Sequence, residues 1–286
     1  MNRRRFLAAF SSGAFFAGCG QRVAGREAAL PRIVSTSPSM TEIVFAIGRG
    51  SSLVGRSSFC DYPAETLAIE VVGGFADPNL ERIVALQPTL VTGERGPAGP
   101  DLPGRLGALG IGTYFPLIDR VTDIEKTIEE MGQKLAAADA ARTLARELGA
   151  QISAVGERVR GAKRPRVVFL FDFRPLIAAG PESFPADALS LAGCDNAVTS
   201  GSKYPTLGPE GLLALDPDLI IDGSAGAYPE SAAELVRSIT GLSHLRALRE
   251  QRVVRLEGTA ALRPGPRIGA GIEQIAKIAH GNVLFP

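Results

Sequence analysis

The sequence predicts an α/β protein with two Rossmann-like lobes, which are joined by one long interdomain α-helix and separated by a cleft. Three observations predict this fold. Short β-rich runs alternate with helical patterns along the chain, which is typical of a mostly parallel sheet. One helix–strand unit occurs twice, and a long amphipathic helical pattern stands between its two copies. The length of 286 residues is enough for about two domains of roughly 150 residues each.

The predicted N-terminal lobe covers residues 31–138 and begins with a strand at 32–36. Ser39 and Glu42 have the spacing of a capping box, which predicts a helix that runs from there to Gly48. The other elements expected in this lobe are strands at 53–55, 90–92 and 112–115 and short helices at 79–86 and 102–109.

A long helical pattern follows the first lobe, from about Thr122 to Arg160, with one break near Ala138 and Asp139. Its later part places apolar residues at steps of three and four, which puts them on one face: Leu144, Leu148, Ile152, Val155 and Val159. We assign residues 139–162 to the interdomain helix, which at 1.5 Å per residue is about 35 Å long.

The predicted C-terminal lobe covers residues 163–286, with strands at 167–171, 219–222 and 253–256 and helices at 186–192 and 268–279. An internal repeat links it to the first lobe, because residues 79–91 align with 208–220 at a constant offset. The alignment pairs Glu81 with Glu210 and repeats a capped helix, a proline and a buried strand. Two equivalent lobes leave a cleft between them, where ligands preferentially bind.

Composition excludes several classes of protein. The 31 basic and 30 acidic residues give a net charge of +1, which argues against nucleic-acid binding. Three cysteines are too few for a disulfide scaffold. His244 and His280 are the two histidines, so a metal-ion site or an enzyme is a remote alternative. An exported hydrolase would need a nucleophile motif, and none is present.

The first residues predict export. Residues 1–19 combine three arginines, a short apolar run and small residues before Cys19, which is typical of a bacterial lipoprotein signal. A lipid on the Cys19 thiol would anchor the protein to a membrane at its extracytoplasmic face, with residues 20–30 as a tether. Arg3 and Arg4 also fit a twin-arginine signal, and an ordinary cleaved signal with a chance cysteine is the alternative.

The mature chain resembles the metal-chelate-type periplasmic binding proteins of ABC importers, which include cobalamin, haem and ferric-siderophore binders. The resemblance covers nearly all of residues 31–286, and the first lobe is most similar to the cobalamin group. Five stretches carry it in order: 32–42 (RIVSTSPSMTE), 60–63 (CDYP), 79–83 (NLERI), 208–210 (GPE) and 263–267 (RPGPR).

The resemblance implies a monomeric periplasmic binding protein, not an enzyme, that captures a corrinoid such as cobalamin and delivers it to a permease dimer driven by its ATPase. Haem or a ferric siderophore is the alternative ligand, and no intrinsic cofactor is implied. One surface glutamate on each lobe would dock to the permease, and here these match Glu81 and Glu210. Alternatively, each is a first-turn carboxylate favoured by the helix dipole.

The expected ligand site lies at the carboxyl ends of the strands. Its candidate residues are Ser37, Pro38, Ser39, Asp61, Tyr62, Phe75, Arg95, Phe173, Arg174, Tyr204 and Arg263. Tyr62 would ligate iron if the ligand were haem. Tryptophan, on which cobalamin binders commonly pack the corrin, is absent, and arginines in the cleft would suit anionic ligands better. Phe173 has a second interpretation as a core residue and Arg174 as a solvated one.

Two cysteines of the mature chain, Cys60 and Cys194, fall on different predicted lobes. A disulfide between them would restrict the hinge, but two separate, partly buried thiols are the favoured interpretation.

Overall fold

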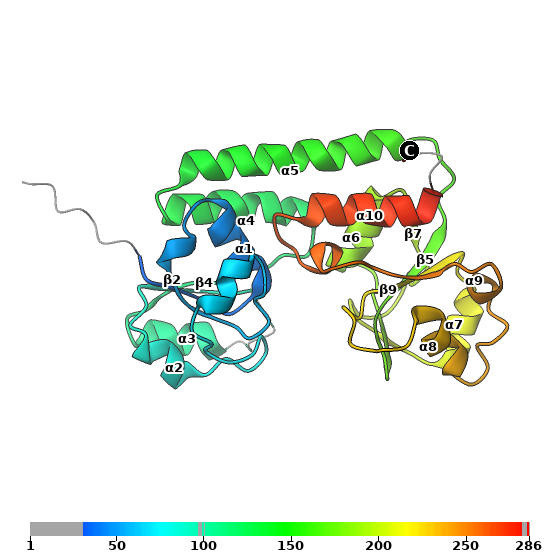
Figure 1. Cartoon of the computed structure of the whole chain (residues 1–286), viewed down its shortest axis with the longest axis horizontal. Coiled ribbons are helices and arrows are strands. Elements are labelled where there is room, and N and C mark those ends of the chain that lie inside the picture. The colour runs from blue at the N-terminus through cyan, green and yellow to red at the C-terminus, as the bar shows by residue number, and fades with distance from the viewer. Residues whose placement is uncertain (1–30, 97–98, 100, 282–284, 286) are drawn as a thin grey trace, which may run out of the picture. The chain divides into compact units, whose positions relative to one another are not determined.

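A computed structural model describes residues 31–96, 99, 101–281 and 285 (Figure 1). The predicted export signal, its lipidation residue Cys19 and the tether lie outside the described residues. Residues 31–286 cluster as one compact unit, so the division into lobes after residues 138 and 162 stays a prediction. Within the described part of the chain, no helix combines the length and apolar character needed to cross a membrane.

The N-terminal lobe is built on a four-stranded parallel sheet in the order β2-β1-β3-β4. Every residue of the central strand β1 is buried, because helices cover both faces of the sheet. The strands are β1 (Ile33–Ser35), β2 (Leu53–Arg56), β3 (Leu90–Thr92) and β4 (Gly112–Tyr114). The helices are α1 (Pro38–Ala46), α2 (Leu80–Ala85), α3 (Asp101–Ala108) and α4 (Val121–Lys134).

The C-terminal lobe contains a mixed six-stranded sheet in the order β10-β9-β5-β6-β8, with β7 paired to β5. Its strands are β5 (Arg166–Phe173), β6 (Leu176–Ala178), β7 (Asp195–Asn196), β8 (Thr206–Leu207), β9 (Leu219–Asp222) and β10 (Val253–Arg255). Its helices are α6 (Phe184–Leu191), α7 (Pro209–Leu215), α8 (Ala232–Ser238), α9 (Arg246–Arg249) and α10 (Ile268–His280). The antiparallel strands β6 and β8 were not predicted, because each is too short to carry a periodic pattern.

The helix α5 (Ala138–Val159) packs against α4 at one end and α10 at the other, and Figure 1 shows these three helices side by side. The predicted apolar stripe faces this contact, since Leu148, Ile152, Val155 and Val159 are buried. The bend between α4 and α5 is tight, because a Cβ on Gly132 would lie 2.2 Å from that of Ala141. One apolar core therefore continues from the first sheet through α5 to the second.

The internal repeat is visible in the elements themselves. The helix α7 and the strand β9 begin at the positions that the sequence alignment pairs with the first residues of α2 and β3. Both helices are short and carry a glutamate in the first turn. Figure 1 shows both on the side of the compact unit opposite to α5.

The capping box predicted at Ser39 and Glu42 is wrong. The N-cap of α1 is Ser37, whose hydroxyl accepts a hydrogen bond from the Met40 amide, and Pro38 occupies the first helical position. Proline is favoured there because that amide needs no partner, so the helix starts one residue before Ser39. Glu42 then falls in the second turn, where its carboxylate binds two arginines of the C-terminal lobe instead.

Candidate functional site

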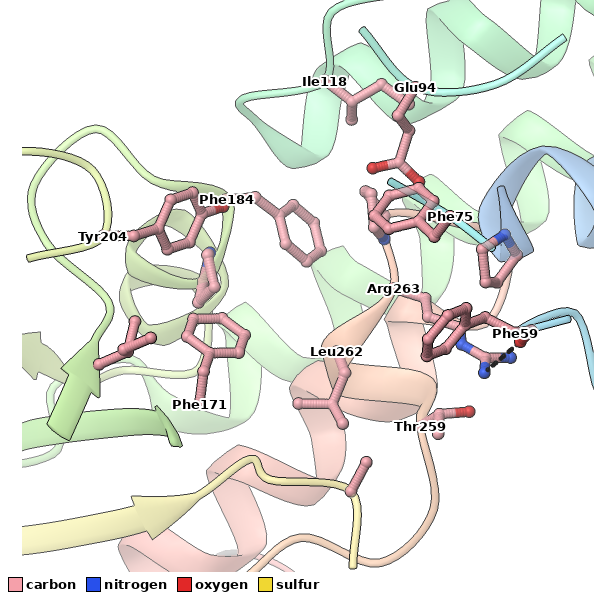
Figure 2. A pocket seen from close by; sticks show the side chains of 15 residues that line it. Phe59, Phe75, Glu94, Ile118, Phe171, Phe184, Tyr204, Thr259, Leu262 and Arg263 are labelled. Atoms are coloured by element: carbon pink, nitrogen blue, oxygen red, sulfur yellow. Dashed lines mark hydrogen bonds between the residues drawn. The ribbon is translucent and has the colours of Figure 1, made fainter. Parts of the chain in front are cut away.

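A pocket of about 440 Å³ lies between the two lobes and draws its walls from both (Figure 2). It has the size and the mainly apolar lining of a small-molecule site. The N-terminal lobe contributes Pro38, Phe59, Phe75, Glu94 and Ile118. The rest of the lining is Phe171, Ile177, Phe184, Pro185, Tyr204, Ala225, Thr259, Leu262, Arg263 and Pro264.

Aromatic rings form two facing walls of this pocket. Phe59 and Phe75 come from loops of the first lobe, while Phe171, Phe184 and Tyr204 come from β5, α6 and the loop before β8. Phe59 is 60% exposed and Tyr204 is 50% exposed, whereas most large apolar side chains of the described residues are buried in the core. Large exposed rings that gather at one place mark a binding surface, and flat rings suit a flat macrocycle.

Arg263 is at the rim of the pocket, but its charge is directed away from it. Figure 2 shows its guanidinium turned toward Phe59, whose carbonyl accepts a hydrogen bond from Nη2 at 3.2 Å. Nη1 donates to Asp61 Oδ1 at 2.6 Å and to Glu42 Oε1 at 3.1 Å. The hydrogen bond from Arg263 lowers the pKa of Asp61. Two carboxylates therefore compensate this arginine.

Arg267 completes the same ion cluster one turn further on. Its guanidinium binds the buried Glu42 carboxylate and lies 4.0 Å from the centre of the Tyr62 ring. Tyr62 is 47% exposed and stacks on this arginine at the side of the pocket rather than lining it.

Glu94 is the other charged residue of the pocket lining. Ser39 donates a short hydrogen bond to its carboxylate, and the Ser37 and Ser39 hydroxyl oxygens lie 3.3 Å apart. Burial raises the pKa of Glu94, and the hydrogen bonds of these serines and the charge of Arg263 only partly oppose the shift. Ser37 and Ser39 are fully buried, so they support Glu94 from behind.

The structure brings part of the predicted site to this pocket. Pro38, Phe75, Tyr204 and Arg263 line it, and Ser37, Ser39, Asp61 and Tyr62 stand directly behind these residues or beside them.

The remaining predicted residues lie elsewhere. Arg95 donates to the Phe115 carbonyl and lines a second pocket that shares Glu94 with this one, and Arg174 is paired with Glu230. Phe173 is buried in the core, as its second interpretation had it. The pairing of β5 is irregular between Leu170 and Asp172, which moves Phe173 to the face opposite Phe171.

The sequence analysis missed several lining residues, namely Phe59, Glu94, Phe171 and Phe184. Two of them had a signal, because Phe59 and Glu94 directly precede the stretches around Cys60 and Arg95 that were singled out. Phe171 lies at the end of the predicted strand 167–171, and the strand pattern gave no sign that its ring faces the pocket. Phe184 starts α6 after a loop with no recognisable pattern.

The predicted docking residues and cysteines lie outside the pocket. Glu81 and Glu210 occupy the first turns of α2 and α7, and both are exposed. Cys60 and Cys194 are buried, separate thiols, and burial raises the pKa of Cys194 to about 12. In the described part of the chain, no three His, Cys, Asp or Glu side chains gather in a way that could hold a metal ion.

This two-lobed α/β arrangement with a pocket between the lobes defines a substrate-binding protein. Residues 33–260 match the family described as periplasmic binding protein, and the chain belongs to this family. The predicted family and the predicted two-lobed α/β fold class are thereby confirmed.

Named relatives refine this assignment. The chain is 34% identical over 202 residues to the vitamin B12-binding protein of Salmonella typhimurium, covering 69% of this chain and 74% of the relative. Its structure is similar to the apo form of the periplasmic heme-binding protein RhuT from Roseiflexus sp. RS-1, with a TM-score of 0.77 and 26% sequence identity. The match covers 87% of this chain and 99% of the RhuT chain. The structure is also similar to the periplasmic vitamin B12 binding protein BtuF of Vibrio cholerae (TM-score 0.77, 24% identity, 89% and 97% covered), which supports the fold.

Proposed function

We propose that the protein captures a corrinoid, with cobalamin as the first candidate, and delivers it to an ABC import permease. The Salmonella relative supports this ligand by its name, and the aromatic walls supply the flat surfaces that a corrin ring would need. The protein would carry the chelate unchanged, as a substrate-binding protein and not as an enzyme.

The observation that carries the choice of ligand is the charge of the pocket. A ligand with carboxylates, such as haem or a siderophore, needs cations that are free to pair with it. In the described lining, Arg263 is already compensated by Asp61 and Glu42, and the other charged residue is Glu94. Arg95 and Arg174, which were expected to supply positive charge, do not line this pocket. A neutral, amide-bearing macrocycle fits such a pocket better than an anionic one.

Haem is the second candidate, because the structure resembles the heme-binding protein RhuT. Tyr62 would be the expected iron ligand. Its ring packs against Arg267, however, and it is absent from the described lining of the pocket. Haem ligation would therefore require Tyr62 to leave this contact.

The location and partners follow from the family and the sequence. The protein would be exported by the signal at residues 1–19, lipidated on Cys19 and held at the extracytoplasmic membrane face by the tether. As a monomer it would dock through Glu81 and Glu210 to a permease dimer that works with its ATPase. The equivalent positions of these carboxylates on two short helices support paired contacts to arginines.

The visible absorbance of the purified protein tests the proposal, since corrinoids and haem both absorb visible light. We expect a corrinoid spectrum in the isolated protein or, after cobalamin is added and the excess removed, one corrinoid per chain. A retained haem spectrum with no response to cobalamin would overturn the ligand, and retention of neither would overturn chelate binding altogether.

A further inference from the structure

Glu94 follows β3 and points its carboxyl group into an otherwise apolar part of the pocket. Figure 2 shows the carboxylate between Ile118 and Phe75, facing the space that the aromatic rings enclose. The Ser39 hydroxyl holds the group in this direction by a hydrogen bond to Oε1. Within the described part of the chain Oε2 forms no hydrogen bond, so Glu94 presents a polar atom to the pocket from a fixed position.

No cation pairs with Glu94 among the described residues. Arg263 lines the same pocket, but its guanidinium is turned away and bound to Asp61 and Glu42, so its charge acts on Glu94 only from a distance. Arg95 donates to the Phe115 carbonyl. Across the pocket stands the Tyr204 hydroxyl, behind which Asp119 is paired with Lys203. In the described part of the chain Glu94 forms no ion pair. A carboxylate without a paired cation repels a second negative charge that is placed beside it.

From this arrangement we infer that Glu94 is the specificity-determining residue that makes the pocket accept a carboxamide of the ligand and reject a carboxylate at the same place. This inference rests on the proposed function and names the group that selects among chelates. The Glu94 carboxylate can accept a hydrogen bond from the amide nitrogen of a ligand carboxamide. A ligand carboxylate at this position would place two acids in contact, and one of them would have to hold a proton.

The test compares cobalamin with its monocarboxylic acids, in which one peripheral carboxamide is hydrolysed, using each positional isomer. For the wild-type protein we expect at least one isomer to bind about 10- to 100-fold more weakly than cobalamin at neutral pH. We expect this difference in affinity to become smaller at acidic pH, where Glu94 and the carboxyl group of the ligand can both be protonated. Equal affinity for all isomers and cobalamin would overturn the inference without any variant.

The variant Glu94→Gln keeps the shape and hydrogen bonds of the side chain and removes its charge. We expect this variant to bind cobalamin within a few-fold of the wild-type affinity. We also expect it to lose most of the difference in affinity between cobalamin and its monocarboxylic acids. The control is Glu65→Gln, which removes an exposed carboxylate of the same lobe. We expect this variant to keep the difference in affinity between cobalamin and its acids. If Glu94→Gln unfolds at the wild-type temperature and still binds the acids more weakly than cobalamin, the proposed role of Glu94 is contradicted. The proposal of corrinoid binding would then remain intact.

Failure of the proposed function has a different signature, because the wild-type protein would then bind no corrinoid at all. In that case haemin and its dimethyl ester form the matched pair. The role of Glu94 predicts that the neutral ester binds more tightly to the wild-type protein and that Glu94→Gln removes the difference. Equal affinity for haemin and its dimethyl ester would overturn the proposed role of Glu94.

Discussion

Arg267 and Glu42 form an ion pair with two hydrogen bonds, from Nε to Oε2 at 2.8 Å and from Nη2 to Oε1 at 2.6 Å. The two residues are 225 positions apart in the chain and come from different lobes. Arg263 adds a third hydrogen bond to the same carboxylate. Glu42 is almost fully buried, so this cluster joins the lobes directly beneath the pocket.

Removal of the shared carboxylate should destabilise the protein. In Glu42→Ala, two arginines lose their common partner in a largely buried place, and breaking such a pair costs about 3 kcal/mol. Urea unfolding measures this loss in the free energy of unfolding, and Glu65→Gln, which is exposed, serves as the control with a change below about 0.5 kcal/mol. A loss below about 1 kcal/mol for Glu42→Ala would mean that the cluster does not hold the lobes together.

The pair of Asp61 and Arg263 should contribute to stability at neutral pH and lose this contribution in acid. The pKa of Asp61 is lowered in the folded protein, so its stabilising effect is present above the unfolded value of about 4. It is lost as the pH falls through the folded pKa. In Asp61→Asn, the fall in melting temperature between about pH 6 and about pH 3 should be smaller than in the wild-type protein. If the melting temperature of Asp61→Asn falls as much as that of the wild-type protein, the pair of Asp61 and Arg263 is fully screened by solvent.

The facing aromatic walls should supply much of the affinity for the chelate. Phe75→Ala and Tyr204→Ala each remove a ring from one wall, and we expect each to weaken cobalamin binding by about 10-fold or more, measured by calorimetry. Leu213→Ala is the matched control, because this apolar side chain is 45% exposed on α7 and outside the pocket. Wild-type affinity in both aromatic variants would place the ligand elsewhere.

The proposed docking residues, Glu81 and Glu210, should affect transport and not ligand capture. In the double variant Glu81→Ala and Glu210→Ala, cobalamin affinity should stay unchanged, since neither residue lines the pocket. Binding to the permease, measured with the transporter in liposomes, should fall by about 10-fold or more because two charge-assisted contacts are lost. If chelate binding were lost instead, the two carboxylates would belong to the ligand site.

Much of the fold was predictable because it depends on local patterns. The boundaries of β3 and β9 match the predicted ones, and α5 begins one residue before the predicted interdomain helix and ends three residues early. The short antiparallel strands β6 and β8 were missed, since their pairing depends on tertiary contacts rather than on periodicity. The role of Glu42 was missed for a similar reason, because its partners lie more than two hundred residues away.

The site was less predictable than the fold. Loop residues after strands were recognised as a group, and Phe75, Tyr204 and Arg263 do line the pocket. The sequence contains no signal for where the guanidinium of Arg263 points, or for the bulge in β5 that separates Phe171 from Phe173. The expectation of arginines available to an anionic ligand depended on side-chain orientations such as that of Arg263.

The central claim is that the pocket between the lobes binds one neutral corrinoid. Isothermal titration calorimetry of the purified protein with cyanocobalamin, and separately with haemin, tests it most directly. We expect a one-to-one complex with cyanocobalamin and binding at least about 10-fold weaker for haemin. Tight haemin binding without any heat from cyanocobalamin would contradict it.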